Sequence, residues 1–318
     1  MKSGTARESD RRPGIPARGI AAIRAEATPP LLRPRAHLRI RLQPAATSQL
    51  NPPVGPSFPL AVAIFVTANG LLAYGLRRFA RPAVWITGLM LVLFPLFSDT
   101  SDWNDWFTWV KRYSIIIPAF LWAFLRDRPD HRFSRILRVA LPWVLILNVL
   151  EVGLFEMLGP YPLNGVAIAI VGLCIPLKWS QSGAQSQFGF SDPLWQIAYL
   201  MTLTRFFWLH PRFENATAGA LIVLALASLL CAVERDSQNY VGWRLYTLYL
   251  FVLQDSIFPS VSDYLYPTWL HVENRVKLQG TPLAHAWLVL NVVVVAALLI
   301  QRARAWRAQS VLAPAAED

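Results

Sequence analysis

Charged side chains interrupt several long apolar stretches of this chain. They are Lys111, Arg112, Glu151, Glu156, Arg205 and Asp255. A charge at mid-membrane costs about 3 kcal/mol, so such residues face the interior of a helix bundle and pair there. Asn148 lies one turn before Glu151 on the same helical face. Three cations and three carboxylates at similar depth predict one polar cavity, which would bind a small charged solute. Two other interpretations stay open: structural ion pairs, some reaching out to the lipid headgroups, and a proton relay.

Arg205 is the one cation in the apolar stretch 193–209, and it needs a partner from another helix. A guanidinium keeps its charge at any accessible pH, so it must be paired or hydrated. We expect Glu151 to pair with it, because Asn148 completes a hydrogen-bonding face beside that carboxylate. Asp255, at matching depth, is the next candidate.

Three aspartates recur at every third position between two apolar stretches: Asp99, Asp102 and Asp105. On a helix they share one face, where carboxylate oxygens could hold Mg²⁺ or Ca²⁺ and grip a phosphate. Membrane enzymes that transfer prenyl groups use aspartate-rich helices in this way, but they need a second acidic motif facing the first. The other close pair, Asp127 and Asp130, falls on the opposite side of the predicted membrane. We therefore favour a solvated interfacial loop over a metal site.

Other catalytic signals are absent from the sequence. The five histidines are scattered and form no HExxH pair, and there is no GxSxG elbow, phosphate loop or CxxC. The two cysteines, Cys174 and Cys231, lie inside apolar stretches and suit a packing role. The sequence therefore predicts no cofactor, and it does not favour an enzyme.

Nine apolar stretches must position these residues, and each is about long enough to cross a bilayer, which takes roughly 20 residues. They are 58–76, 82–98, 106–125, 139–158, 161–177, 193–209, 216–233, 241–258 and 282–301. Hydrophobic residues make up 54% of the chain and charged ones only 15%, against about a quarter in soluble domains. Many of the 13 tryptophans lie near the ends of the stretches, as in aromatic belts. The sequence predicts an all-α, polytopic transmembrane helix bundle of about nine spans in the inner cell membrane.

The orientation of the bundle follows from the Lys and Arg residues of its short loops, which favour the cytoplasm. If the spans alternate, one side receives Arg77, Arg78, Arg81, Arg126, Arg128, Arg132, Arg135, Arg138, Lys178, Arg235, Arg244, Arg302, Arg304 and Arg307. The other side receives Arg212, Arg275 and Lys277, with Lys111 and Arg112 close to it. We therefore expect the first span to begin outside and the C-terminus to lie in the cytoplasm.

Residues 1–57 form a basic segment rich in Arg, Pro and Ala, for which the composition predicts a disordered tail. The segment carries much of the net charge of +11, but in a chain of this hydrophobicity we expect a bilayer, and no nucleic acid, as the partner. A basic tail should stay inside, which conflicts with a first span that begins outside. We favour the explanation that Val54 is a misread start and that residues 1–53 are not part of the natural product. The predicted domains are this tail, a transmembrane domain over 58–301 and a cytoplasmic tail over 302–318.

Three segments resemble an uncharacterised family of bacterial multi-pass membrane proteins of unknown function. They are WFTWVKRYS at 106–114, NVLE at 148–151 and WRLYTL at 243–248. The resemblance covers about residues 58–301 and implies a helical integral membrane protein without implying an activity. It draws attention to Lys111, Glu151 and Arg244.

Two classes of function remain. The first is transport or binding of a small charged solute in a polar cavity at the outer face. The alternative is a membrane sensor or assembly protein that transports nothing and whose intramembrane charges are structural ion pairs. An enzyme comes third for want of a nucleophile or a metal site, and nothing in the sequence indicates an oligomeric state.

Overall fold

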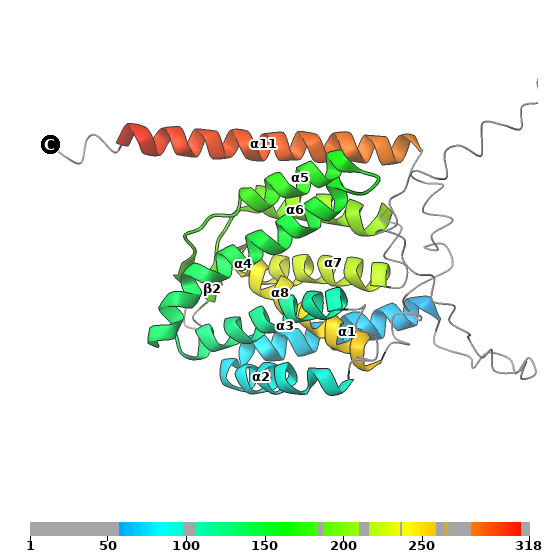
Figure 1. The fold of residues 1–318 in the computed structure, drawn as a ribbon, viewed down its shortest axis with the longest axis vertical. Helices are drawn as coiled ribbons and strands as arrows, with labels where there is room; N and C mark the ends of the chain where they lie inside the picture. Colours follow the sequence, from blue (N-terminus) through cyan, green and yellow to red (C-terminus); the bar gives the residue numbers. More distant parts are fainter. Residues whose placement is uncertain are drawn as a thin grey trace, which may run out of the picture. The chain divides into compact units, whose positions relative to one another are not determined.

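The structure is a computed structural model, which describes residues 57–97, 106–182, 187–209, 216–235, 237–258, 265 and 281–312. All of them belong to one compact unit, Val54–Asp318. Within these residues the chain forms nine α-helices, so the predicted all-helical class is confirmed (Figure 1). The helices are α1 (Phe58–Arg78), α2 (Ala80–Phe97), α3 (Trp106–Asp127), α4 (Arg132–Met157), α5 (Pro162–Leu173), α6 (Pro193–Leu209), α7 (Ala216–Glu234), α8 (Tyr240–Ile257) and α11 (Pro282–Leu312).

Proline marks where several helices begin. It is the first residue of α5, α6 and α11 and lies in the first turn of α1. Proline suits this position because its fixed φ is already helical and the amide hydrogen that it lacks has no partner there. α4 begins differently, because the ring of His131 accepts a hydrogen bond from the backbone N–H of Phe133, at 3.2 Å.

Prolines also lie inside α2, α3 and α4, where each one leaves the carbonyl four residues earlier without its helical hydrogen bond. In α2, Pro95 frees the carbonyl of Leu91, which accepts a hydrogen bond from the hydroxyl of Tyr113 on α3 at 3.4 Å. A neighbouring helix thus supplies the donor, which is how membrane helices tolerate interior proline.

A small antiparallel hairpin, β1 (Ser180–Ser182) and β2 (Gln187–Gly189), follows α5 and pairs Ser180 with Gly189. The sequence did not predict it. It packs against the 3₁₀ turn η3 (Ser237–Asn239) and α8. A Cβ at Gly189 would lie 2.3 Å from the backbone oxygen of Gln238, so only glycine permits this approach.

Close backbone contact joins α4 and α5. A Cβ at Gly165 would lie 2.4 Å from the backbone nitrogen of Met157 and 2.7 Å from the backbone oxygen of Gly153. Small residues let membrane helices approach in this way.

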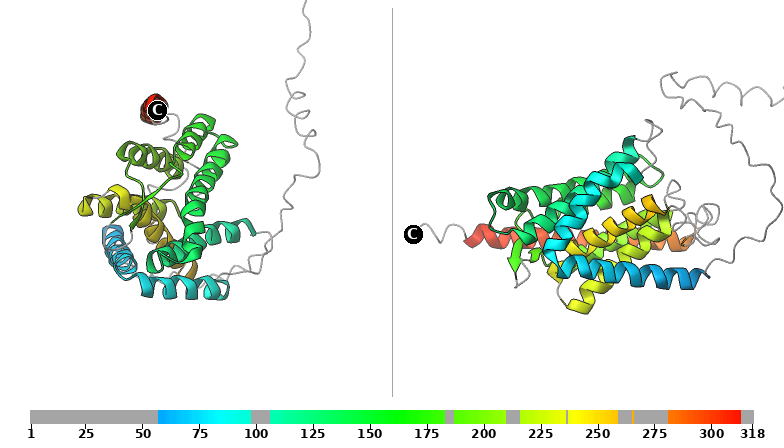
Figure 2. Two further views of the ribbon diagram at one scale, coloured as in Figure 1. Left: turned by 90° about the vertical axis from the view of Figure 1, so that its left-hand side faces the viewer. Right: turned by 90° about the horizontal axis from the view of Figure 1, so that it is seen from below.

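The helices differ in how deeply they are buried. α8 packs against α1, α3 and α7 and is buried along most of its length, whereas α11 lies at an edge, against α5 and α6 (Figures 1 and 2).

Side-chain contacts bring the ends of alternate helices together. Arg77, at the end of α1, forms an ion pair with Glu234, at the end of α7, at 2.5 Å. Arg126, at the end of α3, donates to the backbone carbonyl of Arg77. Arg302, within α11, pairs at 2.5 Å with Asp192, just before α6, and Gln196 in the first turn of α6 donates to the backbone carbonyl of Ser237, just after α7. The helices α1, α3 and α7 therefore end on the same side of the bundle, and α11 runs toward that side.

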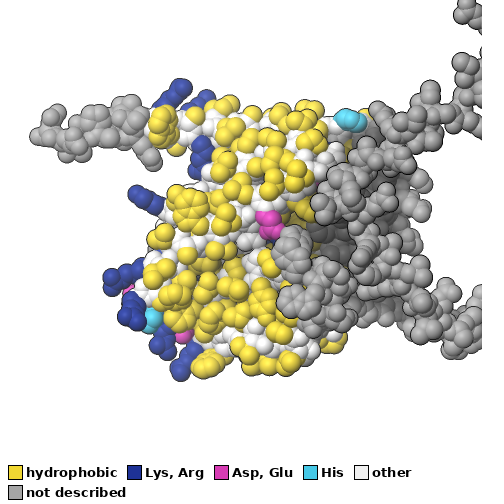
Figure 3. Space-filling view, viewed as in Figure 1, with side chains coloured by type: hydrophobic (Ala, Val, Ile, Leu, Met, Phe, Trp, Pro, Cys, Tyr) yellow, Lys and Arg dark blue, Asp and Glu magenta, His cyan; other side chains and the backbone are white. Residues whose placement is uncertain are grey.

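Within the part of the chain that the structure describes, three helices are long and apolar enough to cross a membrane by length and composition: α1, α4 and α11. The all-helical class is thus confirmed, whereas the expected number of about nine spans is not. α5 is shorter than its predicted stretch 161–177, because the helix ends at Leu173, and α2 and α7 are apolar but also short. Figure 3 shows broad hydrophobic surface over one face, with Lys and Arg side chains gathered at its left edge.

Several predictions from the sequence concern residues that the structure does not describe. These are the disordered tail over residues 1–57 with its start at Val54, and the acidic group of Asp99, Asp102 and Asp105. At the other terminus, α11 continues to Leu312, past residue 302 where the cytoplasmic tail was predicted to begin.

Candidate ligand-binding cavity

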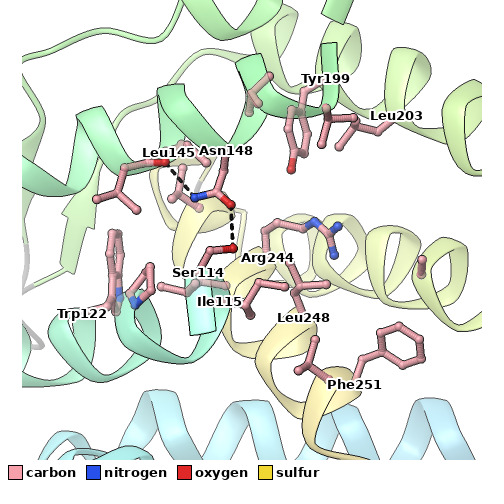
Figure 4. Close-up of a pocket in the computed structure, with 18 of the residues that line it drawn as sticks. Ser114, Ile115, Trp122, Leu145, Asn148, Tyr199, Leu203, Arg244, Leu248 and Phe251 are labelled. Atoms are coloured by element: carbon pink, nitrogen blue, oxygen red, sulfur yellow. Dashed lines mark hydrogen bonds between the residues drawn. The ribbon is translucent and has the colours of Figure 1, made fainter. Parts of the chain in front are cut away.

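A cavity of about 370 Å³ lies between α3, α4, α6 and α8, with smaller contributions from α7 and from the segment after α5. Side chains of α4 and α6 face those of α3 and α8 across it (Figure 4). Most of the lining is aliphatic or aromatic. Its charged lining residues are Lys111, Arg112, Arg244 and Asp255.

One end of the cavity carries two ion pairs, and we call it the rim. Lys111 on α3 lies 2.7 Å from Glu151 on α4, and Arg112 on α3 lies 3.8 Å from Asp255 on α8. The Lys111 and Asp255 side chains are 33% and 28% exposed, so the rim reaches the surface. Because each rim cation has a carboxylate beside it, the rim adds little net charge to the cavity.

One turn below the rim, Ser114 on α3 donates to the side-chain oxygen of Asn148 on α4, at 3.2 Å (Figure 4). The Asn148 amide nitrogen donates in turn to the backbone carbonyl of Val144. Pro118, which also lines the cavity, leaves the backbone carbonyl of Ser114 without a helical donor. These groups are the polar part of an otherwise apolar wall.

Arg244 on α8 is the buried cation of the cavity, with only 6% of its surface exposed. Its Nε and Nη1 atoms make no hydrogen bond, and among the described residues no carboxylate forms an ion pair with it. Figure 4 shows Arg244 and Tyr199 directed from α8 and α6 toward the same space. Arg244 lies near the end of the predicted span 241–258, where a cation is ordinary. For that reason it was not predicted to be a site residue, although the resemblance drew attention to it.

Aromatic rings form the floor of the cavity, at the end away from the rim. The ring of Trp195 stacks on Tyr199 at 5.0 Å and meets Tyr240 edge-on at 6.3 Å. Trp122 and Trp179 meet edge-on at 6.0 Å. These five side chains all line the cavity and bring α3, α6, α8 and the segment after α5 into contact.

A second polar cluster joins α4, α5, α6 and α11 away from the cavity. Its Glu156 is fully buried and accepts a hydrogen bond from Asn164 at 3.3 Å. Arg205 is 3% exposed, lies within electrostatic reach of Glu156 and sits over the Tyr161 ring at 4.9 Å. Asn291 on α11 donates to Asn164 at 3.0 Å. The expected pair of Arg205 with Glu151, or else Asp255, is therefore wrong.

The predicted site residues thus divide between two places. Lys111, Arg112, Asn148 and Asp255 line the cavity, and Glu151 joins them at the rim through its pair with Lys111. The remaining two, Glu156 and Arg205, belong to the second cluster. The described residues contain no group of three or more His, Cys, Asp or Glu side chains that could hold a metal ion.

No protein-family model, curated protein or solved structure matches this chain. The resemblance to an uncharacterised membrane family therefore stays an expectation from the sequence. Any function must be argued from the cavity and the two charge clusters themselves.

Proposed function

We propose that this chain is a multi-pass integral membrane protein in which all nine helices cross the inner membrane, with α1 entering from outside and the C-terminus in the cytoplasm. The alternation of helix direction supports this, since α1, α3 and α7 end together and α11 runs toward the same side. Exposed arginines also gather around those ends, among them Arg128, Arg132 and Arg135. Basic loops favour the cytoplasm.

We propose further that the protein binds or transports a small anion in the cavity between α3, α4, α6 and α8. The observation that carries the proposal is Arg244, a buried guanidinium that faces the cavity without an ion-pair partner among the described residues. A buried charge is costly unless it is paired. An anionic ligand would supply the missing charge, and the cavity supplies the room for it.

The alternative, a sensor or assembly protein held together by ion pairs, has its own support. Lys111 and Glu151 pair at 2.7 Å, and Arg205 lies within reach of Glu156. Together with the pair of Arg112 and Asp255 at 3.8 Å, these contacts account for all six charged site residues predicted from the sequence without any ligand. They do not account for Arg244, which is why we place anion binding first.

Thiol labelling tests the proposal without knowledge of the ligand. In a background in which Cys174 and Cys231 are replaced by alanine, Leu248→Cys places a thiol on the cavity wall, one turn from Arg244. A sulfonate-bearing methanethiosulfonate should modify this thiol about tenfold faster than an ammonium-bearing one, relative to a free thiol in solution. Tenfold corresponds to about 1.4 kcal/mol of attraction.

The control is Ala227→Cys, a fully buried core position on α7 that does not line the cavity and should not react. Faster reaction of Leu248→Cys with the ammonium reagent would indicate a cation site and overturn the proposal. A folded Leu248→Cys protein that reacts with neither reagent would favour the structural alternative.

A further inference from the structure

We infer that the ligand of the cavity is an amphipathic anion: a carboxylate or phosphate head group that pairs with Arg244, attached to an apolar body that fills the rest of the space. This inference rests on the proposed function, that the cavity takes an anion, and it adds the chemical class of that anion.

The head group is argued from the chemistry of Arg244. The guanidinium stays charged at any accessible pH and presents a rigid fork of N–H donors that matches carboxylate or phosphate oxygens. Nε and Nη1, one atom from each of the two forks that a guanidinium offers with Nη2, make no hydrogen bond with the described residues. The cations at the rim, Lys111 and Arg112, already have carboxylates beside them, so Arg244 is the position at which an anion gains most.

The apolar body is argued from the walls. Aliphatic side chains of Ile115, Leu145 and Leu248 line the cavity, and the aromatic rings of Trp195 and Tyr199 line it as well. Figure 4 shows Tyr199 across the space from Leu248. A hydrated inorganic ion would have to lose its water among these groups, with few polar partners in return. An apolar ligand surface gains about 25 cal/mol for each Å² removed from water, so these walls select a ligand with a hydrocarbon body.

The length of the cavity is consistent with such a molecule. Arg244 and Asp255 both line it and are eleven residues apart on one helix, which corresponds to about 16 Å at 1.5 Å per residue. A ligand with its head at Arg244 can therefore extend its chain toward the rim. The ion pairs there leave no net charge to attract a second head group, so one acid group on a single chain fits this arrangement.

The test uses the full-length protein in a neutral maltoside detergent and follows thermal unfolding by tryptophan fluorescence. Decyl phosphate should raise the unfolding temperature, whereas inorganic phosphate, decanol and decyltrimethylammonium at equal concentration should not. Arg244→Met should weaken the apparent affinity for decyl phosphate at least about tenfold, a factor equal to about 1.4 kcal/mol. The control Arg78→Met removes an exposed arginine and should keep the full response.

Two further variants guard against an effect on folding alone. Arg244→Met should be at least as stable as the wild type without ligand, because it removes a buried charge that has no ion-pair partner among the described residues. Arg244→Lys keeps the charge without the fork and should restore part of the decyl phosphate response. Ile115→Trp fills the cavity while leaving Arg244 in place, and it should also abolish the response.

Each result decides between distinct conclusions. Equal stabilisation by inorganic phosphate, or by decanol, would overturn the amphipathic anion. If decyl phosphate does not raise the unfolding temperature but the thiol of Leu248→Cys still reacts faster with the sulfonate reagent, only the amphipathic nature of the ligand is overturned. If that thiol shows no such preference either, the proposed function is overturned as well. Phosphatidic acid in nanodiscs distinguishes the source: stabilisation by it points to a bilayer lipid, and stabilisation by decyl phosphate alone points to a free single-chain anion.

Discussion

Arg205 and Glu156, which lie within electrostatic reach of each other, show how burial changes the value of neighbouring opposite charges. Both are almost fully buried, whereas Lys111 and Glu151 are about one-third exposed. Exposed pairs contribute about 0–1 kcal/mol because water and salt screen them. Removing one partner of a buried pair costs about 3–5 kcal/mol, since the other charge is left in a medium of low polarity. The two pairs should therefore respond differently to the same substitutions.

We predict that Arg205→Met and Glu156→Gln each destabilise the protein by about 3–5 kcal/mol and that the double variant recovers much of the loss. Reversible unfolding in mixed detergent measures these free energies. The matched control is Lys111→Met with Glu151→Gln, for which each single change should cost about 1 kcal/mol or less. Simple addition of the Arg205 and Glu156 losses would show that the two residues do not act as a pair.

The sequence identified these charges but not their partners, and helical geometry explains why. Depth alone made Glu151, and after it Asp255, the candidates for Arg205, and it passed over Glu156. Five residues along a helix correspond to a rotation of about 140°, so Glu151 and Glu156 face different neighbours. Glu151 faces Lys111 on α3, and Glu156 faces Asn164 on α5. Rotation about the helix axis depends on packing, and a single sequence of nearly uniform apolar stretches does not reveal it.

Helix identity was more predictable than helix packing. All nine apolar stretches became helices because apolar length alone specifies them. α5 ended early, at Leu173, a few residues before Pro176. The strands β1 and β2 were not predicted, because each is three residues long and has no alternating apolar pattern. α11 runs beyond its apolar stretch because Ala, Arg and Gln are strong helix formers.

The contact of α4 with α5 gives a prediction at this scale. Gly165→Ala should destabilise the protein by about 1–3 kcal/mol, because its Cβ would lie 2.4 Å from a backbone nitrogen that cannot move aside. The control is Gly75→Ala in α1, where a Cβ meets nothing within 4 Å. That change should be neutral or stabilising by up to about 1 kcal/mol, since alanine favours helix. Unfolding of both variants in detergent measures the difference, and equal effects would contradict the close approach.

The whole molecule raises the question of how many helices cross the membrane. Length and composition single out α1, α4 and α11. Packing favours more, because α8 is buried between α1, α3 and α7. In addition, α3, α6 and α8, which are not among the three helices singled out by length and composition, form walls of the cavity beside α4. Interior helices of a bundle are shielded from lipid by their neighbours, so they can carry charges such as Arg244.

Reporter fusions at two positions separate nine spans from three. If all nine helices cross and α1 begins outside, fusions after Lys178 and after Arg235 should both report the cytoplasm. If only α1, α4 and α11 cross, both positions follow an outward crossing by α4 and should report the exterior. Fusions after Arg81 and after Gly280 serve as controls, because both maps place the first inside and the second outside.

We expect cytoplasmic signals at Lys178 and Arg235, because Gln238, just after α7, donates to the backbone carbonyl of Ser180, just after α5, at 3.0 Å. That hydrogen bond holds the two segments on one side, and the pair between Arg77 and Glu234 ties them to the basic end of α1. Exterior signals at both positions would contradict nine spans and leave the three-span map.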